Sequence, residues 1–544
     1  MPILSWIGKE QVANHDKEVP FKLLKKVKSL SVGDSSQNLI IHGDNLEALK
    51  ALMPFYIGKI KCIYIDPPYN TGNESWVYND KVNSPKIKKW LGKVVGGESE
   101  DLCRHDKWLC MMYPRLKLLR DLLADDGVIF ISINEEELFN LKYICDEVFG
   151  FDNYLTTFTI KVRHEDRILK GDKDFHEVVE YLLMYRCSKK FAIVKRVLDN
   201  TSVSEYVYTI EELNRNPEKI TLGNKIVWVF KPKEFRVMKN EPNEKYLKKI
   251  NIRGSIKEGN SSGRFFMKHL STLKNKNGYL FKVENMGGDE LGCRYFLMPS
   301  SDKKVNGDYF QGVPLDRATT KEVPFPNFLD FEEDFNMVGY EGDIDFRHGK
   351  KPINFLLKLF EIGGIKNINN ALILDSFAGS GSTGHAVLEL NKSDNGDRHF
   401  ILVEMEDYAK DITAERIKRA IKKEGYKDGF EFCELDKPLF NEEGQIEEEC
   451  TFEQLATYIY FTETQTNLEK KNVSGNLIGE HGGTAFWLIF KEKGKNVLDK
   501  SFLKKLKKDK HKKVIYADKC LLDENTLERF NIQFKQIPYE VKVY

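Results

Sequence analysis

The chain has 544 residues, of which 41% are hydrophobic and 12% aromatic, which is enough apolar material for two to four globular domains. Its 84 Lys and Arg residues nearly balance 83 Asp and Glu residues, so it is no polycation, and any nucleic-acid surface must be a local patch. The nine cysteines are scattered without a Cys-x-x-Cys pair, which argues against a structural zinc site or a disulfide framework and fits a reducing cytosol.

The first 36 residues are mixed and basic, and we predict a lead-in segment with one helix. Lys9 and Glu10 interrupt the apolar residues at the start, so we expect no signal peptide. No apolar run approaches about 18 residues, so we expect no membrane span and a cytoplasmic protein.

Two predicted strands follow, at residues 38–41 and 60–65. Between them, the turn at Gly43-Asp44 leads into a helix that Asp44 or Asn45 can cap.

The second strand ends at Asp66-Pro67-Pro68-Tyr69. Two consecutive prolines offer no backbone N–H, so the chain must leave the sheet there. A carboxylate, two proline carbonyls and an aromatic ring then project past the strand end. Asp66 and a proline carbonyl can accept hydrogen bonds from an exocyclic amine, while Tyr69 can stack on the base that carries it. An ordinary exit from a strand into a loop is the alternative interpretation.

The next segments predict a parallel sheet with crossover helices. Residues 76–97 read as a loop, either a lid or DNA contact or simply solvated. Apolar residues at helical spacing predict a helix over 104–123. A buried strand at 128–133 and a helix at 138–148 follow, and this alternation is typical of right-handed βαβ units.

Two β-rich runs, 154–162 and 178–185, predict an antiparallel pair at one edge of this sheet. Between them lies Phe175-His176-Glu177, which has either a direct role in a site or a structural role only.

The alternating pattern breaks over residues 191–344, where short β-like runs carry interleaved basic and aromatic residues. Arginine can read guanine edges and lysine can neutralise phosphate, so the segment is a candidate for DNA contact. The candidate DNA-binding residues are Arg236, Arg253, Arg264, Lys268 and Arg294.

A second chemical motif follows the predicted helix 353–361. Residues 371–387 read as a strand, a glycine turn and a helix, with Gly379, Gly381 and Gly384 in a Gly-x-Gly-x-x-Gly pattern. The next strand, 399–403, ends in Glu404, whose carboxylate can hold ribose hydroxyls. Alone, this fingerprint is compatible with NAD, whereas a P-loop is disfavoured because His385 stands where it requires Lys.

The two motifs together resemble those of amino-directed DNA methyltransferases of the permuted beta class. Asp66-Pro67-Pro68-Tyr69 has the form typical of adenine-N6 enzymes and is similar to the modification (Mod) subunits of type III restriction-modification systems. The resemblance covers residues 37–190 and 345–410 and implies a circularly permuted, Rossmann-like class I methyltransferase fold. Its sheet should be mostly parallel with an antiparallel edge pair.

The resemblance implies S-adenosylmethionine as the cofactor and requires no metal. It assigns catalysis to Asp66, Pro67, Pro68 and Tyr69. It places the cofactor at Asp44, Lys351, Asp375, Phe377, Gly379, Gly381, Thr383 and Glu404. For Asp44 a plain helix cap is an equal alternative. Residues 191–344 would then be an inserted target-recognition domain for double-stranded DNA.

The remaining residues, 411–544, are highly charged, and we expect a folded α/β extension that serves dimerisation or a restriction partner. Nothing in the chain resembles a nuclease or helicase motif, so cleavage would need such a partner. Three alternatives remain open: a cytosine-N4 methyltransferase, a nucleotide-dependent oxidoreductase, and an inactive DNA-binding protein.

Overall fold

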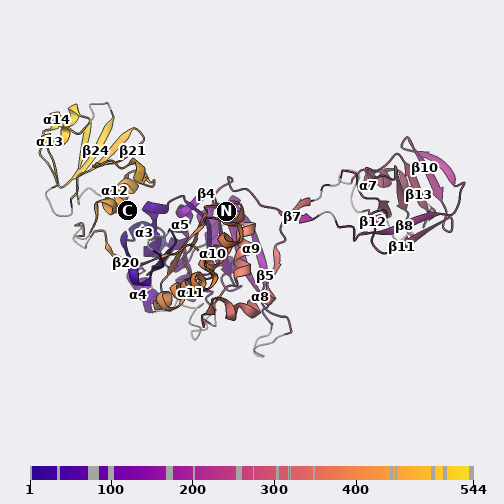
Figure 1. Cartoon of the computed structure of the whole chain (residues 1–544), viewed down its shortest axis with the longest axis horizontal. Helices are drawn as coiled ribbons and strands as arrows, with labels where there is room; N and C mark the ends of the chain where they lie inside the picture. Colours follow the sequence, from indigo (N-terminus) through magenta and orange to yellow (C-terminus); the bar gives the residue numbers. More distant parts are fainter. Residues whose placement is uncertain are drawn as a thin grey trace. The chain divides into compact units, whose positions relative to one another are not determined.

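The structure, a computed structural model, divides into two compact units, residues 1–194 with 326–544 and residues 195–325 (Figure 1). It describes residues 3–33, 37–71, 85–95, 103–166, 175–199, 202–252, 260–273, 275–301, 306–316, 318, 320–346, 349–440, 445–447, 450–491, 496–506 and 511–537.

The first unit is organised around a ten-stranded sheet. Its strands, in spatial order, are β1 (Lys22–Lys26), β20 (Glu431–Pro438), β2 (Leu39–His42), β19 (His399–Glu404), β18 (Leu372–Asp375), β3 (Ile60–Ile65), β4 (Leu123–Ile133), β6 (Val179–Arg186), β5 (Tyr154–Lys161) and β17 (Phe328–Asp330). The strands from β20 to β4 run parallel, which confirms the predicted fold class.

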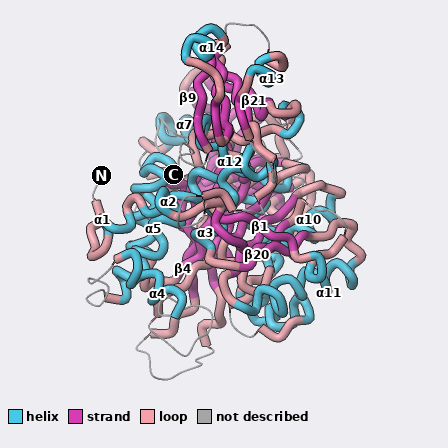
Figure 2. The backbone as a smooth tube through the Cα atoms, turned by 90° about the vertical axis from the view of Figure 1, so that its left-hand side faces the viewer, coloured by secondary structure: helices cyan, strands magenta, loops and turns pink. Residues whose placement is uncertain are grey.

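Helices cover both faces of this sheet, and Figure 2 shows α5 and α10 on either side of the strands. The apolar stripes of three helices pack on one face, where they form the largest core: α3 (Asn45–Tyr56), α5 (Arg104–Leu122) and α6 (Leu138–Cys145). On the other face lie α9 (Ile353–Ile362), whose Phe355 packs edge-on against Tyr64 of β3, and α10 (Ser382–Asp394). Both faces of the central strands are therefore buried, as their near-continuous apolar runs require.

The predicted antiparallel pair is present as β5 and β6, but it is not the edge of the sheet. The short strand β17 pairs in parallel with β5 outside it. Residues 326–344, which include β17 and α8 (Glu332–Met337), therefore pack with the first unit. Three residues are too short a run to give a clear period-two pattern, so the sequence alone did not reveal this strand.

Two other local predictions were wrong. The lead-in segment supplies two one-turn helices, α1 (Lys9–Val12) and α2 (His15–Glu18), and an edge strand, β1, that pairs antiparallel with β20. Lys22, Lys25 and Lys26 make that strand look like a solvated basic segment, yet charged residues are common on edge strands. The segment read as loop contains the helix α4 (Pro85–Val94); residues 72–84 and 96–102 lie outside the described residues.

The C-terminal extension is an α/β layer with a four-stranded sheet, ordered β21 (Leu477–His481), β22 (Thr484–Leu488), β24 (Lys512–Ala517) and β26 (Ile532–Gln536). Its last three strands are parallel. The other elements here are α12 (Phe452–Thr464), β23 (Val497–Leu498), α13 (Lys500–Leu503), β25 (Lys519–Cys520) and α14 (Glu524–Arg529). α12 shares a core with Leu23 of β1 and with Phe21, which directly precedes that strand.

The second unit is an antiparallel sheet of eight strands. Their order is β11 (Phe235–Lys239), β8 (Tyr206–Glu212), β12 (Leu247–Asn251), β15 (Asp308–Gln311), β14 (Cys293–Leu297), β13 (Leu280–Glu284), β10 (Lys225–Phe230) and β9 (Glu218–Leu222). The helix α7 (Ser261–Phe265) packs with one of its two cores. A separate pair, β7 (Arg196–Asp199) with β16 (Thr320–Val323), brings the two ends of the unit together.

Among the described residues, none of the helices has the length and apolarity that crossing a bilayer requires.

Candidate active site

The two sequence motifs meet at the carboxyl ends of two central strands of the large sheet. β3 and β18 are adjacent and parallel, with Leu374 opposite Ile63. Asp66 and Asp375 therefore lie at the carboxyl ends of neighbouring strands. The helix α10, which follows β18, packs on one face of the sheet, and α5, which follows β3, packs on the other. The strand order therefore reverses between β18 and β3. Open α/β sheets bind ligands at such a reversal.

The corner after β3 is fixed from behind by α5. The Trp108 indole donates a hydrogen bond to the Pro68 carbonyl at 2.6 Å. Asn70 adopts φ 58°, a left-handed conformation that asparagine tolerates better than most residues. Its amide donates to the buried Glu137 carboxylate, and Arg104 donates to the Asn70 carbonyl at 3.0 Å. These contacts hold Tyr69 in place from both sides.

Asp66, Tyr69 and Lys351 are buried and form a cluster with Glu180, whose side chain is 17% exposed. The Tyr69 hydroxyl lies 2.8 Å from Asp66 Oδ1 and 3.0 Å from Glu180 Oε2. Lys351 Nζ lies 2.8 Å from Glu180 Oε2, 2.7 Å from the Tyr69 hydroxyl and 3.3 Å from Asp66 Oδ1. The structure thus groups Lys351 with the Asp66 motif, although the family resemblance had assigned it to the cofactor.

One acceptor of this cluster is open. Asp66 Oδ2 is buried and has no hydrogen-bond partner among the residues that the structure describes. A buried carboxylate oxygen without a donor costs free energy, roughly 1–3 kcal/mol. The geometry therefore leaves one position where an incoming N–H group can bind.

Burial and charge set the protonation of this cluster. Burial raises the pKa of Asp66 to about 6, with Glu180 adding to the shift and the Lys351 ammonium opposing it. Burial also opposes ionisation of Glu180 and Lys351. The Lys351 ammonium outweighs it for Glu180, whose pKa is lowered, and the charges of Asp66 and Glu180 outweigh it for Lys351, whose pKa is raised. Glu180 and Lys351 are hence a charged pair.

The glycine turn after β18 forms a backbone cradle. Gly379 and Gly381 have φ 52° and 80°, and Gly381 precedes the first residue of α10. A Cβ atom on Gly381 would lie 3.1 Å from the Thr413 carbonyl oxygen. The turn therefore needs glycine for its conformation and its close packing.

Acidic residues flank this cradle. Asp375 accepts hydrogen bonds from the Phe377 amide at 3.0 Å and the Thr383 hydroxyl at 2.5 Å. Glu404, at the end of β19, accepts from the Gly379 amide at 2.8 Å. Burial raises the pKa of Asp375 to about 7, so this carboxyl group changes charge near neutral pH.

Asp44 is a helix cap, and it also lines a pocket. Its carboxylate accepts from the Leu46 and Glu47 amides at the start of α3. A pocket of about 610 Å³ lies at the ends of β2 and β19, and its lining includes His42, Asp44, Trp90 and Met405. Both alternatives for Asp44 are thus compatible with its position, and Trp90 of α4 adds an aromatic wall that the sequence did not predict.

Sequence reasoning missed the residues that support these motifs from other elements. Glu180 was overlooked in favour of Phe175-His176-Glu177, of which Phe175 is 85% exposed. Arg416 is fully buried and donates to the Ser380 and Ser382 hydroxyls at 2.9 and 2.7 Å beneath the glycine turn. The available signal for Glu180 was a charged residue inside an apolar strand. Arg416 lies in the highly charged helix α11 (Glu415–Glu424), where one more arginine gave no signal.

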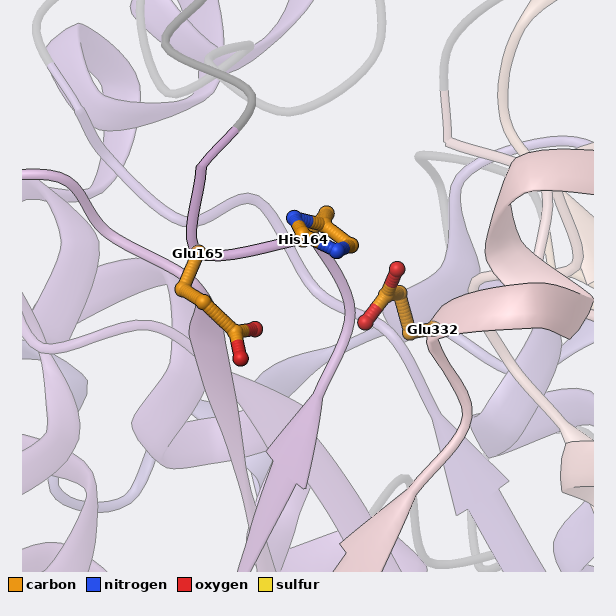
Figure 3. Close-up of side chains that lie close together, drawn as sticks. All are labelled: His164, Glu165 and Glu332. Carbon is orange, nitrogen blue, oxygen red and sulfur yellow. The ribbon is translucent and has the colours of Figure 1, made fainter.

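A second group of polar side chains lies away from this site. His164, Glu165 and Glu332 face one another with their ligand atoms within 4.8 Å (Figure 3). Lys161 Nζ lies 2.7 Å from both carboxylates, so a cation would have to compete with this ammonium. The group is best explained as an ion-pair network.

The candidate DNA-binding residues of the second unit differ in position. Arg236, Arg264 and Lys268 are exposed. Arg294 is buried, with its guanidinium 2.7 Å from Asp289 and 3.2 Å from the Phe310 carbonyl. A buried and paired arginine has a structural role in this unit. Arg253 lies outside the described residues.

Comparison with known proteins relates this geometry to a family. The model of a DNA methylase family, N6_N4_Mtase, matches residues 60–415. The EcoPI Mod subunit of a type III restriction-modification enzyme from Escherichia phage P1 is 28% identical over 74% of this chain and 63% of its own length. The EcoP15I Mod subunit of Escherichia coli is 27% identical over 77% and 69%.

The StyLTI Mod subunit of Salmonella typhimurium is 31% identical over 69% of this chain and 53% of its own length. The chain thus spans between about half and two thirds of the length of these curated relatives. The family match covers more than half of the chain and includes both motifs that meet at the sheet edge. The chain belongs to the N6_N4_Mtase family of DNA methylases.

Proposed function

We propose that this chain is a DNA methyltransferase that transfers a methyl group from S-adenosylmethionine to the N6 amine of an adenine in double-stranded DNA. We further propose that it is the modification subunit of a type III restriction-modification system. The observation that carries the reaction is the open, buried oxygen of Asp66 beside a glycine cradle on the neighbouring strand.

The residues around the cradle fit the proposed cofactor. Asp375 can pair with the ammonium of the methionine part, Glu404 with the ribose hydroxyls, and the pocket lined by Asp44 and Met405 can hold an adenine ring. Phe377, Gly379, Gly381 and Thr383 would complete this site. When bound, S-adenosylmethionine supplies an electrophilic methyl group on a sulfonium.

The adenine amine lies inside a DNA duplex, so the base must leave the stack at a cost of a few kcal/mol. Asp66 Oδ2 and the Pro67 carbonyl would then accept the two amine hydrogens and turn the nitrogen lone pair toward the methyl group. The nitrogen would then bond to the methyl carbon as the carbon–sulfur bond breaks, the bonding pair would stay on sulfur, and the methylated amine would release one proton to solvent. Alignment and the carboxylate beside the developing positive charge would provide the rate enhancement.

Stacking of Tyr69 on the target base would require a conformational change. Tyr69 is only 4% exposed, and its hydroxyl is bound to the cluster. Stacking on an extruded base therefore requires one face of the ring to become accessible when DNA binds. Pro67 and Pro68 would hold the corner rigid while this happens.

Asp66→Ala tests the proposal. We expect it to lower methyl transfer from labelled S-adenosylmethionine to DNA by about 100-fold or more, the size of losing one preorganised polar partner, while cofactor binding by calorimetry stays unchanged. Asp126→Ala is a matched control, because Asp126 is an exposed partner of Lys61 at the opposite end of β3. Mass spectrometry of the digested DNA identifies the product.

Retained transfer by Asp66→Ala would refute its role. N4-methylcytosine as the product would favour the cytosine-N4 alternative, which the family model also spans. Aspartate at position 66 supports adenine as the target base, because serine is more frequent at this position in cytosine-N4 enzymes.

The partners belong to the same proposal. The named relatives are Mod subunits, so we propose a cytoplasmic homodimer that associates with a restriction subunit. Analytical ultracentrifugation of the chain alone, and copurification with a type III restriction subunit, test the two parts separately.

A further inference from the structure

Glu180 lies in a part of the sheet from which it can reach the corner after β3. Strand β4 separates β3 from β6, but β4 ends at Ile133, which pairs with Tyr181. Glu180 is one residue beyond that last pair, so no strand lies between its side chain and Asp66. Glu180 is the carboxylate of β6 that enters the Asp66 cluster.

A single oxygen of Glu180 organises the cluster. Oε2 lies 2.8 Å from Lys351 Nζ and 3.0 Å from the Tyr69 hydroxyl. The hydroxyl also accepts from Lys351 Nζ, at 2.7 Å. Its single proton is therefore shared between Glu180 Oε2 and Asp66 Oδ1, which lies 2.8 Å away. The contacts of Asp66 are thus all on Oδ1, and Oδ2 is left open.

We propose that Glu180 is a positioning residue for the methyl transfer: by holding Lys351 and the Tyr69 hydroxyl against Asp66 Oδ1, it keeps Asp66 Oδ2 open for the target amine. This inference rests on the proposed function, because it concerns the same corner. Lys351 shares this role as the cationic partner of both carboxylates.

The charges around Asp66 make the proposal testable. Within the described part of the chain, Asp66 interacts electrostatically with five other titratable groups. They are Lys351 before α9, Glu180 on β6, Tyr69 in the corner, Tyr64 on β3 and Asp375 on β18. The negative charge of Glu180 raises the pKa of Asp66, and the ammonium of Lys351 lowers it. The acid limb of the pH–activity profile is the range in which activity falls as the pH is lowered. Neutralising Glu180 alone and neutralising Lys351 alone should therefore shift this acid limb in opposite directions.

The test uses the full chain with Glu180→Gln and Lys351→Met, and measures kcat and KM for DNA between about pH 5 and about pH 9. Transfer requires ionised Asp66, so wild-type activity should fall below about pH 6. Glu180→Gln should lower kcat by about 10- to 100-fold, the size of a misplaced reacting group, and move the acid limb to lower pH. Lys351→Met should move it to higher pH, with little change in KM for either variant.

Glu431→Gln is the matched control, because Glu431 pairs with Lys26 at 2.6 Å near the other edge of the same sheet. It removes the same charge from a Glu–Lys pair and should leave both kcat and the acid limb unchanged. If Glu180→Gln does not fold, Glu180→Asp keeps the charge but shortens the side chain; it should lower kcat without moving the limb.

Wild-type kcat and an unmoved limb in Glu180→Gln, or wild-type kcat in Glu180→Asp, would overturn the positioning role. A loss of kcat with the limb unmoved in both Glu180→Gln and Lys351→Met would assign the pair to structure alone and would also overturn it. Product identity is a separate readout: N4-methylcytosine would contradict the proposed adenine specificity while leaving the limb positions interpretable.

Discussion

At the scale of single residues, the site consists of acids whose protonation is set by burial. Asp66 and Asp375 are both at least nine-tenths buried, and burial is the largest contribution to the raised pKa of each. Hydrogen bonds from Thr383 and the Phe377 amide oppose the shift of Asp375. Each acid is therefore close to a change of charge near neutral pH, and a positive charge placed beside it would favour its ionised form.

Cofactor binding should therefore depend on pH through Asp375. Its pKa is about 7 in the free protein, so the carboxyl is partly protonated at neutral pH and must lose its proton to pair with an ammonium. We expect the affinity for S-adenosylmethionine to rise from about pH 6 to about pH 8, with proton release. Calorimetry in two buffers of different ionisation enthalpy measures that release.

Asp375→Asn provides the control for this titration, because it keeps the shape of the side chain without a titrating proton. It should bind more weakly and lose the dependence on pH in this range. An affinity that does not change with pH in the native chain, together with heats that are the same in both buffers, would contradict the role of Asp375.

The residue scale also shows what a sequence can and cannot predict here. Asp66 and the glycines were predictable because their chemistry lies within a short local pattern. Glu180, Arg416 and Trp108 were not, because each acts through a partner that folding brings from far along the chain. Arg294 shows the reverse case: an arginine in a basic and aromatic segment is buried against Asp289.

At the scale of elements, the site depends on where strands end and helices begin. β3, β18 and β19 end at Ile65, Asp375 and Glu404, and α10 begins directly after Gly381. These ends were predicted because prolines, glycines and acids interrupt apolar runs. The strand β17 was missed because three residues are too short a run to show a strand pattern. β1 and α4 were missed because their charged residues suggested solvated segments.

The glycine turn gives a prediction at this scale. Gly381→Asp should abolish binding of S-adenosylmethionine, because it introduces a side chain where φ is 80° and the Thr413 carbonyl lies 3.1 Å from the new Cβ. It also places a negative charge at the cofactor cradle. Calorimetric titration of the purified variant measures the loss.

Gly425 offers a control with similar backbone strain and free space. It has φ 66°, and a Cβ there would meet nothing within 4 Å. Gly425→Asp should lower stability by about 1–2 kcal/mol and leave the cofactor affinity unchanged. Wild-type affinity in Gly381→Asp would remove the turn from the cofactor site.

At the scale of the whole molecule, the chain combines two units with separate cores. The predicted recognition segment, 191–344, contains the second unit, residues 195–325. A compact insertion was foreseeable from the break in the alternating pattern, but its antiparallel eight-stranded sheet was not, because its strands are short and only weakly alternating. Assigning DNA recognition to this unit is a proposal.

Excision of residues 195–325 tests that proposal. β7 and β16 pair antiparallel, with Arg196 opposite Val323, so a short Gly-Ser linker can replace the unit. We expect the shortened protein to retain cofactor affinity and to lose its preference among DNA sequences. Methylation mapped by sequencing on a library of random sites would show this, and site-selective transfer by the shortened protein would contradict it.

The adjacency of β3 and β18 has a consequence for biosynthesis. These strands are neighbours in the sheet although about 300 residues separate them along the chain. At about 5–20 residues per second, a nascent polypeptide emerging from the ribosome would keep one side of β3 without its partner for about 15–60 s. The central apolar strands are thus the part of this protein that most needs chaperone protection during translation.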